Sequence, residues 1–112
     1  MNKYRNKKVI YNGTKYDSKK ETRRAVQLKL MEKAGLISNL QMQVPYLLID
    51  TIRYKGKTYP KTQYYADFQY IENGKVVVED VKSEITKKDK TYRLKIKLLL
   101  SKYKEIDFRE VI

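Results

Sequence analysis

Alternating and helically spaced apolar residues divide this chain into a short series of elements. Residues 39–49 (NLQMQVPYLLI) and 62–83 have the alternation and composition of strands. Apolar positions repeat at helical spacing in residues 18–34 and again in a segment that follows the residues 62–83 and ends at about residue 103. Residues 106–112 predict a closing strand. The order is therefore helix, strand, two hairpin strands, helix, strand, which indicates one α/β (α+β) domain.

The first predicted helix begins with a capping box. Ser18 is a good N-cap residue and Glu21 stands three positions later, while Gly35 marks the end after Ala34. Glu21 also shares an i, i+4, i+7 stripe with Ala25 and Leu28, so it is either a cap or a residue that faces the sheet.

The second helix is predicted to start at Thr86 or Asp89 and to run through about Tyr103. Its core stripe is Tyr92, Ile96, Leu99 and Tyr103. In the first long strand, Pro45 predicts an edge, a bulge or a bend. Tyr54-Lys55-Gly56-Lys57 predicts a turn before the central hairpin.

The central hairpin turns at Asn73-Gly74, a pair that favours a type I′ turn because both residues must adopt positive φ. With these two at the tip, paired residue numbers sum to 147, and Asp67 lies directly opposite Asp80. Lys82 joins Asp80 on that face because side chains alternate along a strand. The pattern predicts two carboxylates and one ammonium close together.

Two opposed carboxylates destabilise a strand pair unless something neutralises them. A hard cation such as Mg²⁺ prefers carboxylate oxygens and would remove the repulsion. The alternative is a solvated face on which Lys82 simply pairs with one acid. A three-residue loop would shift the register by one and separate the acids.

The charge of the chain points to a polyanionic partner. Its 112 residues carry 26 Lys and Arg against 13 Asp and Glu, a formal charge of +13. Residues 1–34 carry net +8 and residues 82–104 net +7, whereas residues 35–81 are neutral overall. We divide the chain into a basic arm at 1–15 and a folded domain at 16–112. Within the arm, Val9-Ile10-Tyr11 indicates a short strand and Asn12-Gly13 a turn. Helix-surface lysines are often only solvated, but these segments suggest contacts to a DNA backbone through Lys19, Lys20, Arg23, Arg24, Lys87, Lys88, Lys90, Arg93 and Lys97.

Missing residue types narrow the chemistry. The chain has no cysteine and no histidine, which excludes thiolate nucleophiles, imidazole bases and most zinc sites. No apolar run approaches membrane-spanning length, and no signal peptide opens the chain. We expect a cytoplasmic protein with no membrane and no small-molecule substrate.

The element order, an acid in the second strand and D-x-K in the third resemble the PD-(D/E)XK nuclease superfamily. The matching residues are Asp67, Asp80 and Lys82, with Ala66 where the proline of the motif would stand. The segments YDSKKE, KAGLISNL, YYADF and VVEDVKS look like short phage endonucleases or Holliday-junction resolvases. The resemblance implies a restriction-endonuclease-like αβββαβ core with a mixed four-stranded sheet flanked by helices.

The same resemblance implies Mg²⁺, with Mn²⁺ as a substitute, held by Asp67, Asp80, the Val81 carbonyl and Glu21. It assigns Lys82 to position the attacking water, and it implies 5′-phosphate and 3′-hydroxyl products. No separate base-reading module is evident, so we expect recognition of branched DNA, in phage recombination, rather than of a base sequence. Two cuts across a junction require two sites, so we also expect a homodimer. If a phage encodes the protein, its compartment is the cytoplasm of a bacterial host. Glu79 falls on the opposite face and Gln43 on an outward polar face, so neither is assigned to the site.

Two other classes remain open. One is a non-catalytic, basic nucleic-acid-binding protein of the same fold, in which some of the eleven tyrosines stack on bases. The other is a small phage protein that acts on a protein partner. Cleavage that depends on Mg²⁺ separates the enzyme from both.

Overall fold

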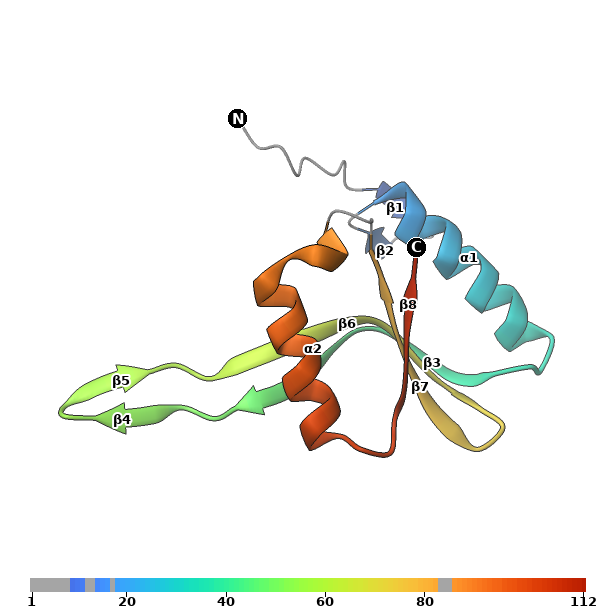
Figure 1. Ribbon diagram of the computed structural model, residues 1–112. Coiled ribbons are helices and arrows are strands. Elements are labelled where there is room, and N and C mark those ends of the chain that lie inside the picture. Colours follow the sequence, from blue (N-terminus) through green and yellow to red (C-terminus); the bar gives the residue numbers. More distant parts are fainter. Residues whose placement is uncertain (1–8, 12–13, 17, 83–85) are drawn as a thin grey trace.

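The computed structural model describes residues 9–11, 14–16, 18–82 and 86–112. The chain forms one small α+β domain (Figure 1). Its elements in order are β1 (Val9–Tyr11), β2 (Thr14–Tyr16), α1 (Lys19–Lys33), β3 (Ser38–Ile49), β4 (Ile52–Tyr54), β5 (Lys57–Tyr59), β6 (Thr62–Glu72), β7 (Lys75–Val81), the 3₁₀ turn η1 (Thr86–Lys88), α2 (Lys90–Lys102) and β8 (Asp107–Val111).

A mixed four-stranded sheet organises the domain. Its strand order is β3-β6-β7-β8, with antiparallel pairing from β3 to β7 and parallel pairing between β7 and β8. The segment that contains α2 connects these two parallel strands, as a parallel pair requires. The predicted order of helix, three strands, helix and strand is confirmed, and Pro45 lies in β3 at the edge of the sheet.

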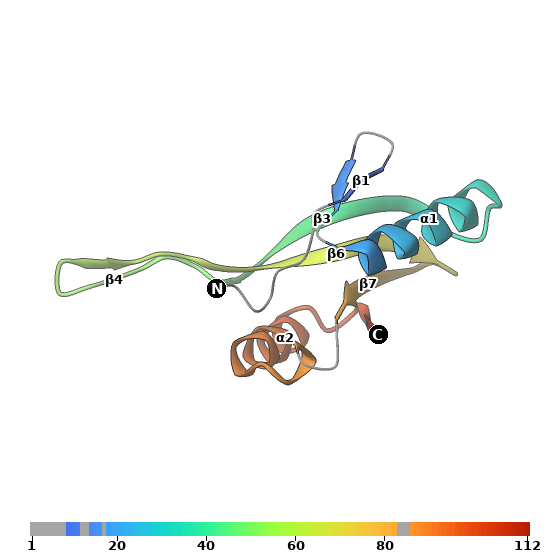
Figure 2. The same ribbon diagram turned by 90° about the horizontal axis from the view of Figure 1, so that it is seen from above.

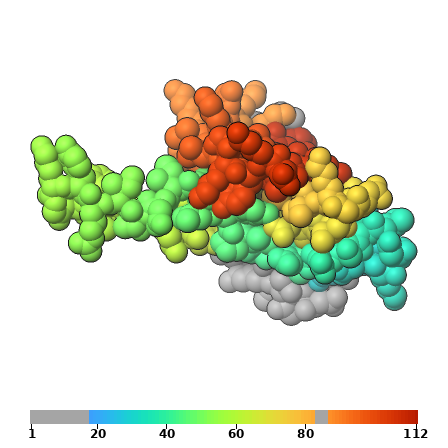
Figure 3. All heavy atoms as spheres, turned by 90° about the horizontal axis from the view of Figure 1, so that it is seen from below, coloured from blue at the N-terminus to red at the C-terminus, as the bar shows by residue number. Residues whose placement is uncertain are grey.

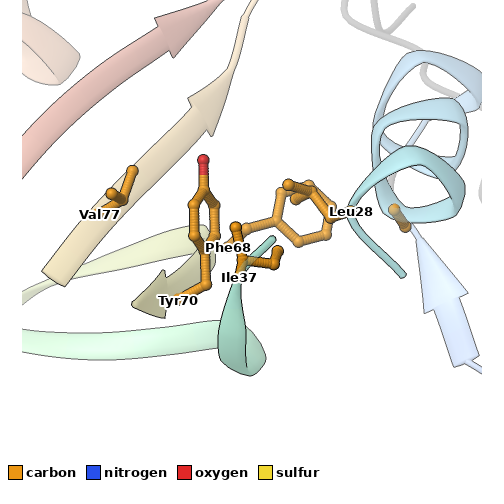
Figure 4. Close-up of a cluster of buried hydrophobic side chains, with 6 residues drawn as sticks. Leu28, Ile37, Phe68, Tyr70 and Val77 are labelled. Atoms are coloured by element: carbon orange, nitrogen blue, oxygen red, sulfur yellow. The ribbon is translucent and has the colours of Figure 1, made fainter. Parts of the chain in front are cut away.

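One helix covers each face of the sheet (Figure 2). Val77 packs in the cluster that contains Ala25 and Leu28 of α1, whereas the next residue, Val78, packs in the cluster that contains Leu99 of α2. Successive strand residues point to opposite faces, so the two helices lie on opposite sides. Figure 4 shows the cluster on the α1 side, labelled at Leu28, Ile37, Phe68, Tyr70 and Val77.

The hairpin between β6 and β7 has the predicted register. Asn73 and Gly74 have φ of 53° and 77°, and Glu72 pairs with Lys75. The pairing continues regularly to Phe68 opposite Glu79. The two-residue turn therefore excludes the three-residue loop that would have shifted the register.

Both helix boundaries agree with the sequence. The Ser18 side chain caps α1 by accepting a hydrogen bond from the Glu21 amide at 3.1 Å. The helix ends at Lys33 with Ala34 as its C-cap. Asp89 rather than Thr86 caps α2, and Thr86 opens the 3₁₀ turn η1.

Two features were not predicted. The short strand expected at 9–11 is confirmed as β1, but its pairing with a second strand, β2, was not predicted. The proposed turn at Asn12-Gly13, and residues 1–8 of the arm, lie outside the described residues. The segment read as a plain turn at 54–57 is the tip of a separate hairpin, β4–β5, which projects from the body (Figures 1 and 3).

Candidate functional site

The candidate site lies where β6 and β7 separate. Their ladder ends at the pair Phe68–Glu79, one step before Asp67 and Asp80. Beyond this pair, a side-chain hydrogen bond replaces the backbone pairing: Asp67 Oδ2 accepts a hydrogen bond from the Val81 amide at 2.7 Å. The Asp67 side chain therefore bridges the two strands and holds its own carboxylate next to β7.

Asp80 is almost entirely buried, with 1% of its surface exposed. Its Oδ1 accepts a hydrogen bond from the Tyr64 hydroxyl at 2.6 Å. Its Oδ2 is buried and has no hydrogen-bond partner among the described residues, and the Lys82 Nζ lies 3.5 Å away. A buried carboxylate oxygen without a hydrogen bond is costly, so this atom is suited to a cationic ligand.

Lys82 is held beside Asp80 from two directions. Its backbone amide donates to the Val111 carbonyl at 2.9 Å, which fixes the end of β7 against β8. Its ammonium lies 4.8 Å from the centre of the Tyr92 ring on α2. The ring face attracts the cation and orients it toward the acids.

Glu21 joins this group from α1. Its side chain is buried, with 3% exposed, and its Oε1 accepts a hydrogen bond from Gln43 Nε2 at 2.7 Å. The same Gln43 nitrogen lies 3.5 Å from Asp67 Oδ1. Gln43 has a φ of 53°, a left-handed conformation that is uncommon for a residue with a side chain. Glu21 thus faces the sheet in addition to its place in the helix cap.

The electrostatics of the group follow from burial of like charges. Burial, followed by the nearby charges of Asp80 and Glu21, raises the pKa of Asp67 to about 7. Burial also raises the pKa of Asp80, although Lys82 and the Tyr64 hydroxyl oppose this. Two neighbouring carboxyls that both resist ionisation are typical of functional sites.

The residues fit a metal ion in part. Within the described ranges, no group of three or more acidic side chains is arranged to hold an ion by itself. The Gln43 amide stands between Glu21 and Asp67, which leaves Asp67 and Asp80 as the adjacent pair. Two carboxylates are enough for Mg²⁺, which keeps several of its waters.

Arg24, one of the predicted DNA contacts, has a partner within the protein. Its guanidinium pairs with Glu79 through hydrogen bonds of 2.8 and 2.6 Å. The Tyr70 hydroxyl also donates to Glu79, which is fully buried. Arg24 stands four residues before Leu28, on the buried side of α1. As expected, Glu79 faces away from Asp80, on the α1 side.

The other candidate cations divide between two places. On α1, Lys19 and Arg23 are exposed and Lys20 is half-buried. On the α2 side, a groove of about 540 Å³ is lined by Tyr92, Ile96, Leu100 and Glu110 together with the predicted Lys87, Lys88, Arg93 and Lys97. Lys90 lines a smaller hollow of about 360 Å³ with Arg93 and Lys97. Tyr92 connects the larger groove to the site, because Lys82 lies over its ring.

Gln43 is the site residue that sequence reasoning missed. Strand alternation placed it on a polar outward face. The neighbouring residue types do not indicate that its backbone adopts a positive φ. The contact became visible only when β3, β6 and α1 were placed together.

The fold and this group of side chains define a small α+β domain in which the half-buried Asp67 and the buried Asp80 lie beside a lysine. The chain belongs to the DUF1064 family, described as proteins of unknown function, whose model matches residues 1–112. No curated protein and no solved structure matches the chain. Among the described residues, no helix is both long and apolar enough to cross a membrane.

Proposed function

We propose that this protein is a Mg²⁺-dependent DNA endonuclease of the PD-(D/E)XK kind, selective for branched DNA such as Holliday junctions. One observation carries the proposal. The half-buried Asp67 and the buried Asp80 meet where two strands part, with the Lys82 ammonium 3.5 Å from an Asp80 oxygen that has no hydrogen bond among the described residues. Neighbouring carboxylates with little access to water lower the stability of the fold, which a purely structural role would not require.

Each side chain then has a role. Asp67, Asp80 and the Val81 carbonyl would hold the metal, and Glu21 would add charge from α1. The bound metal would neutralise charge on the scissile phosphate and on the leaving oxygen. Lys82 would orient the attacking water or stabilise the phosphate. The Tyr64 hydroxyl and the Val81 amide fix the two carboxylates before substrate arrives.

The cationic surfaces supply the substrate side of the proposal. The groove along α2 presents Lys87, Lys88, Arg93 and Lys97 next to Tyr92 and Lys82. Phosphate contacts of this kind position a duplex without reading its sequence. A homodimer would place two such sites across a junction.

A second candidate is a non-catalytic DNA-binding protein of the same fold. It is favoured by the hydrogen bond between Gln43 and Glu21, which occupies an oxygen that a third metal ligand would need. In that case the carboxylate pair would be a remnant, and the basic surfaces would carry the function alone.

The test is a cleavage assay on duplex, single-stranded, flap and four-way-junction DNA, with Mg²⁺, Mn²⁺ or EDTA. We expect cleavage with either metal and none in EDTA. Asp80→Asn should abolish cleavage and leave DNA binding intact or tighter, because a repulsive charge is lost. Glu105→Gln, which alters an exposed carboxylate outside the site, is the matched control. DNA binding without cleavage on any substrate would favour the second candidate.

A further inference from the structure

The hairpin β4–β5 is a separate two-stranded ribbon that extends from the body of the protein (Figures 1 and 3). Every residue of both strands is exposed. Its turn is a tight one, with φ of 49° at Lys55 and 76° at Gly56. A two-stranded hairpin gains little stability by itself in water, so a protruding one indicates a use outside the folded body.

One face of this ribbon is rich in large side chains. Ile52 pairs with Tyr59, and Tyr54 pairs with Lys57, so these four residues point the same way. Ile52, Tyr54 and Tyr59 keep 51%, 60% and 47% of their surface exposed. Lys57 lies 5.3 Å from the centre of the Tyr59 ring, and Lys55 lies 5.5 Å from that of Tyr54. Ammonium groups and aromatic rings are thus presented together.

The charge of the ribbon identifies the partner. Residues 49–62 carry four basic side chains and one acidic, net +3, while the rest of the segment 35–81 carries one basic and four acidic, net −3. The apparently neutral middle of the chain is therefore a basic arm joined to an acidic centre. A second copy of a chain with charge +13 would be repelled by this arm, whereas a phosphate backbone would be attracted.

We propose that β4–β5 is a DNA-binding arm that contacts duplex DNA beyond the phosphate held at the carboxylate pair. This inference rests on the proposed function for the position of that phosphate. A two-stranded ribbon has the width that the major groove admits. Tyr59 at the end of β5 and Asp67 in β6 are eight residues apart, which corresponds to at most roughly 26 Å at about 3.3 Å per residue. At ~3.4 Å per base pair, this end of the arm lies at most roughly eight base pairs from the site.

The experiment compares two variants that lose equal charge. The arm variant replaces Arg53, Lys55 and Lys57 by Gln. The control variant replaces the exposed Lys33, Lys75 and Lys104 by Gln, which lie outside the arm and outside the predicted DNA contacts. Binding to a duplex of about 30 base pairs is measured in EDTA across a salt series. Melting temperature and molar mass in solution are recorded for each protein.

We expect the arm variant to bind roughly tenfold or more weakly near 0.1 M salt. Its plot of log affinity against log salt should lose up to about 2.7 of slope, since each phosphate contact contributes about 0.9. The control should stay within about twofold of the parent in affinity. On a duplex of about six base pairs, too short to reach the arm, the arm variant and the parent should bind equally.

Equal loss of affinity in the arm and control variants would overturn the inference, because the arm would then act only through net charge. A change of molar mass in the arm variant alone would overturn it as well, since the ribbon would then be a surface for self-association. The outcome is separable from catalysis. If binding depends on the arm but the protein never cleaves DNA, the arm proposal stands and the nuclease proposal fails. If the protein cleaves DNA but binding does not depend on the arm, the nuclease proposal stands and the arm proposal fails.

Discussion

Loss of the Asp67 proton should make the metal-free protein less stable as the pH rises. The folded state raises the pKa of Asp67 from 3.8 to about 7, so the folded protein keeps this proton longer than the unfolded chain does. The stability associated with the proton is present below the unfolded pKa and is lost as the pH rises from about 4 to about 7. At pH 8 Asp67 is ionised, although its burial and the nearby charges of Asp80 and Glu21 disfavour this state.

The magnitude follows from the shift. About three pKa units at about 1.36 kcal/mol each give an upper value of ~4 kcal/mol. Asp67 is partly exposed, and solvent screening reduces this, so we expect a loss of about 2 kcal/mol. The chain has no histidine, and no side chain has an ordinary pKa between 5 and 8. Because the pKa of Asp80 is raised as well, a variant of Asp67 is needed to assign the loss to this residue.

Asp67→Asn is the perturbation that isolates this effect. The Asn side chain keeps an oxygen that can accept the hydrogen bond from the Val81 amide. Urea unfolding in EDTA at about pH 5 and pH 8 gives the free energy of unfolding at both ends. The parent should lose about 2 kcal/mol between them, and Asp67→Asn should lose less than about 0.5 kcal/mol and be the more stable protein at pH 8. Glu105→Gln should follow the parent.

Addition of Mg²⁺ extends the same assay. A ligand that binds only the folded state stabilises it by RT ln(1 + [L]/Kd), so saturating Mg²⁺ should restore the loss at pH 8 in the parent and not in Asp67→Asn. If the free energy of unfolding depended on pH equally in the parent and in Asp67→Asn, the reasoning would be refuted. Ionisation of Asp67 would then not destabilise the folded protein.

Two further predictions concern α1. Arg24→Met should lower the free energy of unfolding by about 3 kcal/mol in urea titrations, because it leaves the fully buried Glu79 carboxylate without its cation; a loss no larger than for the exposed Arg23→Met would show that the pair is unimportant. Glu21→Gln keeps the size and the capping ability of the residue but removes its charge. If Glu21 serves the metal, this variant should lose most of its cleavage rate while its melting temperature moves by no more than about 2 °C. Normal cleavage by Glu21→Gln, measured beside an inactive Asp80→Asn, would reduce Glu21 to a helix cap.

The sequence predicted the features that depend on neighbouring residues. Asn73-Gly74 demands positive φ at two adjacent positions, and this alone fixed the register of β6 against β7 and the side of the sheet on which Asp80 and Glu79 lie. Helix caps and core stripes followed in the same way from short-range spacing. These signals are local, so no knowledge of the tertiary structure was needed.

The remaining features depend on contacts between distant segments. Arg24 looked like one more surface cation of a basic helix, because nothing near it in the sequence indicates its pairing with Glu79, 55 residues away. Gln43 joined the site only through the packing of three elements. The strands of the β4–β5 ribbon have three residues each, too few for alternation to identify a strand in a sequence.

The position of Lys82 at the end of β7 sets an order in which the site can assemble during folding. Asp67 and Asp80 belong to a single hairpin, and closing so short a loop is rapid. The anchor of Lys82 is the carbonyl of Val111 on β8, which reaches β7 only after α2 has crossed the sheet. Parallel pairing of this kind is slow because the intervening segment must first be ordered. We therefore expect the two acids to meet early and the contacts that hold Lys82 in place, to Val111 and to Tyr92, to form last.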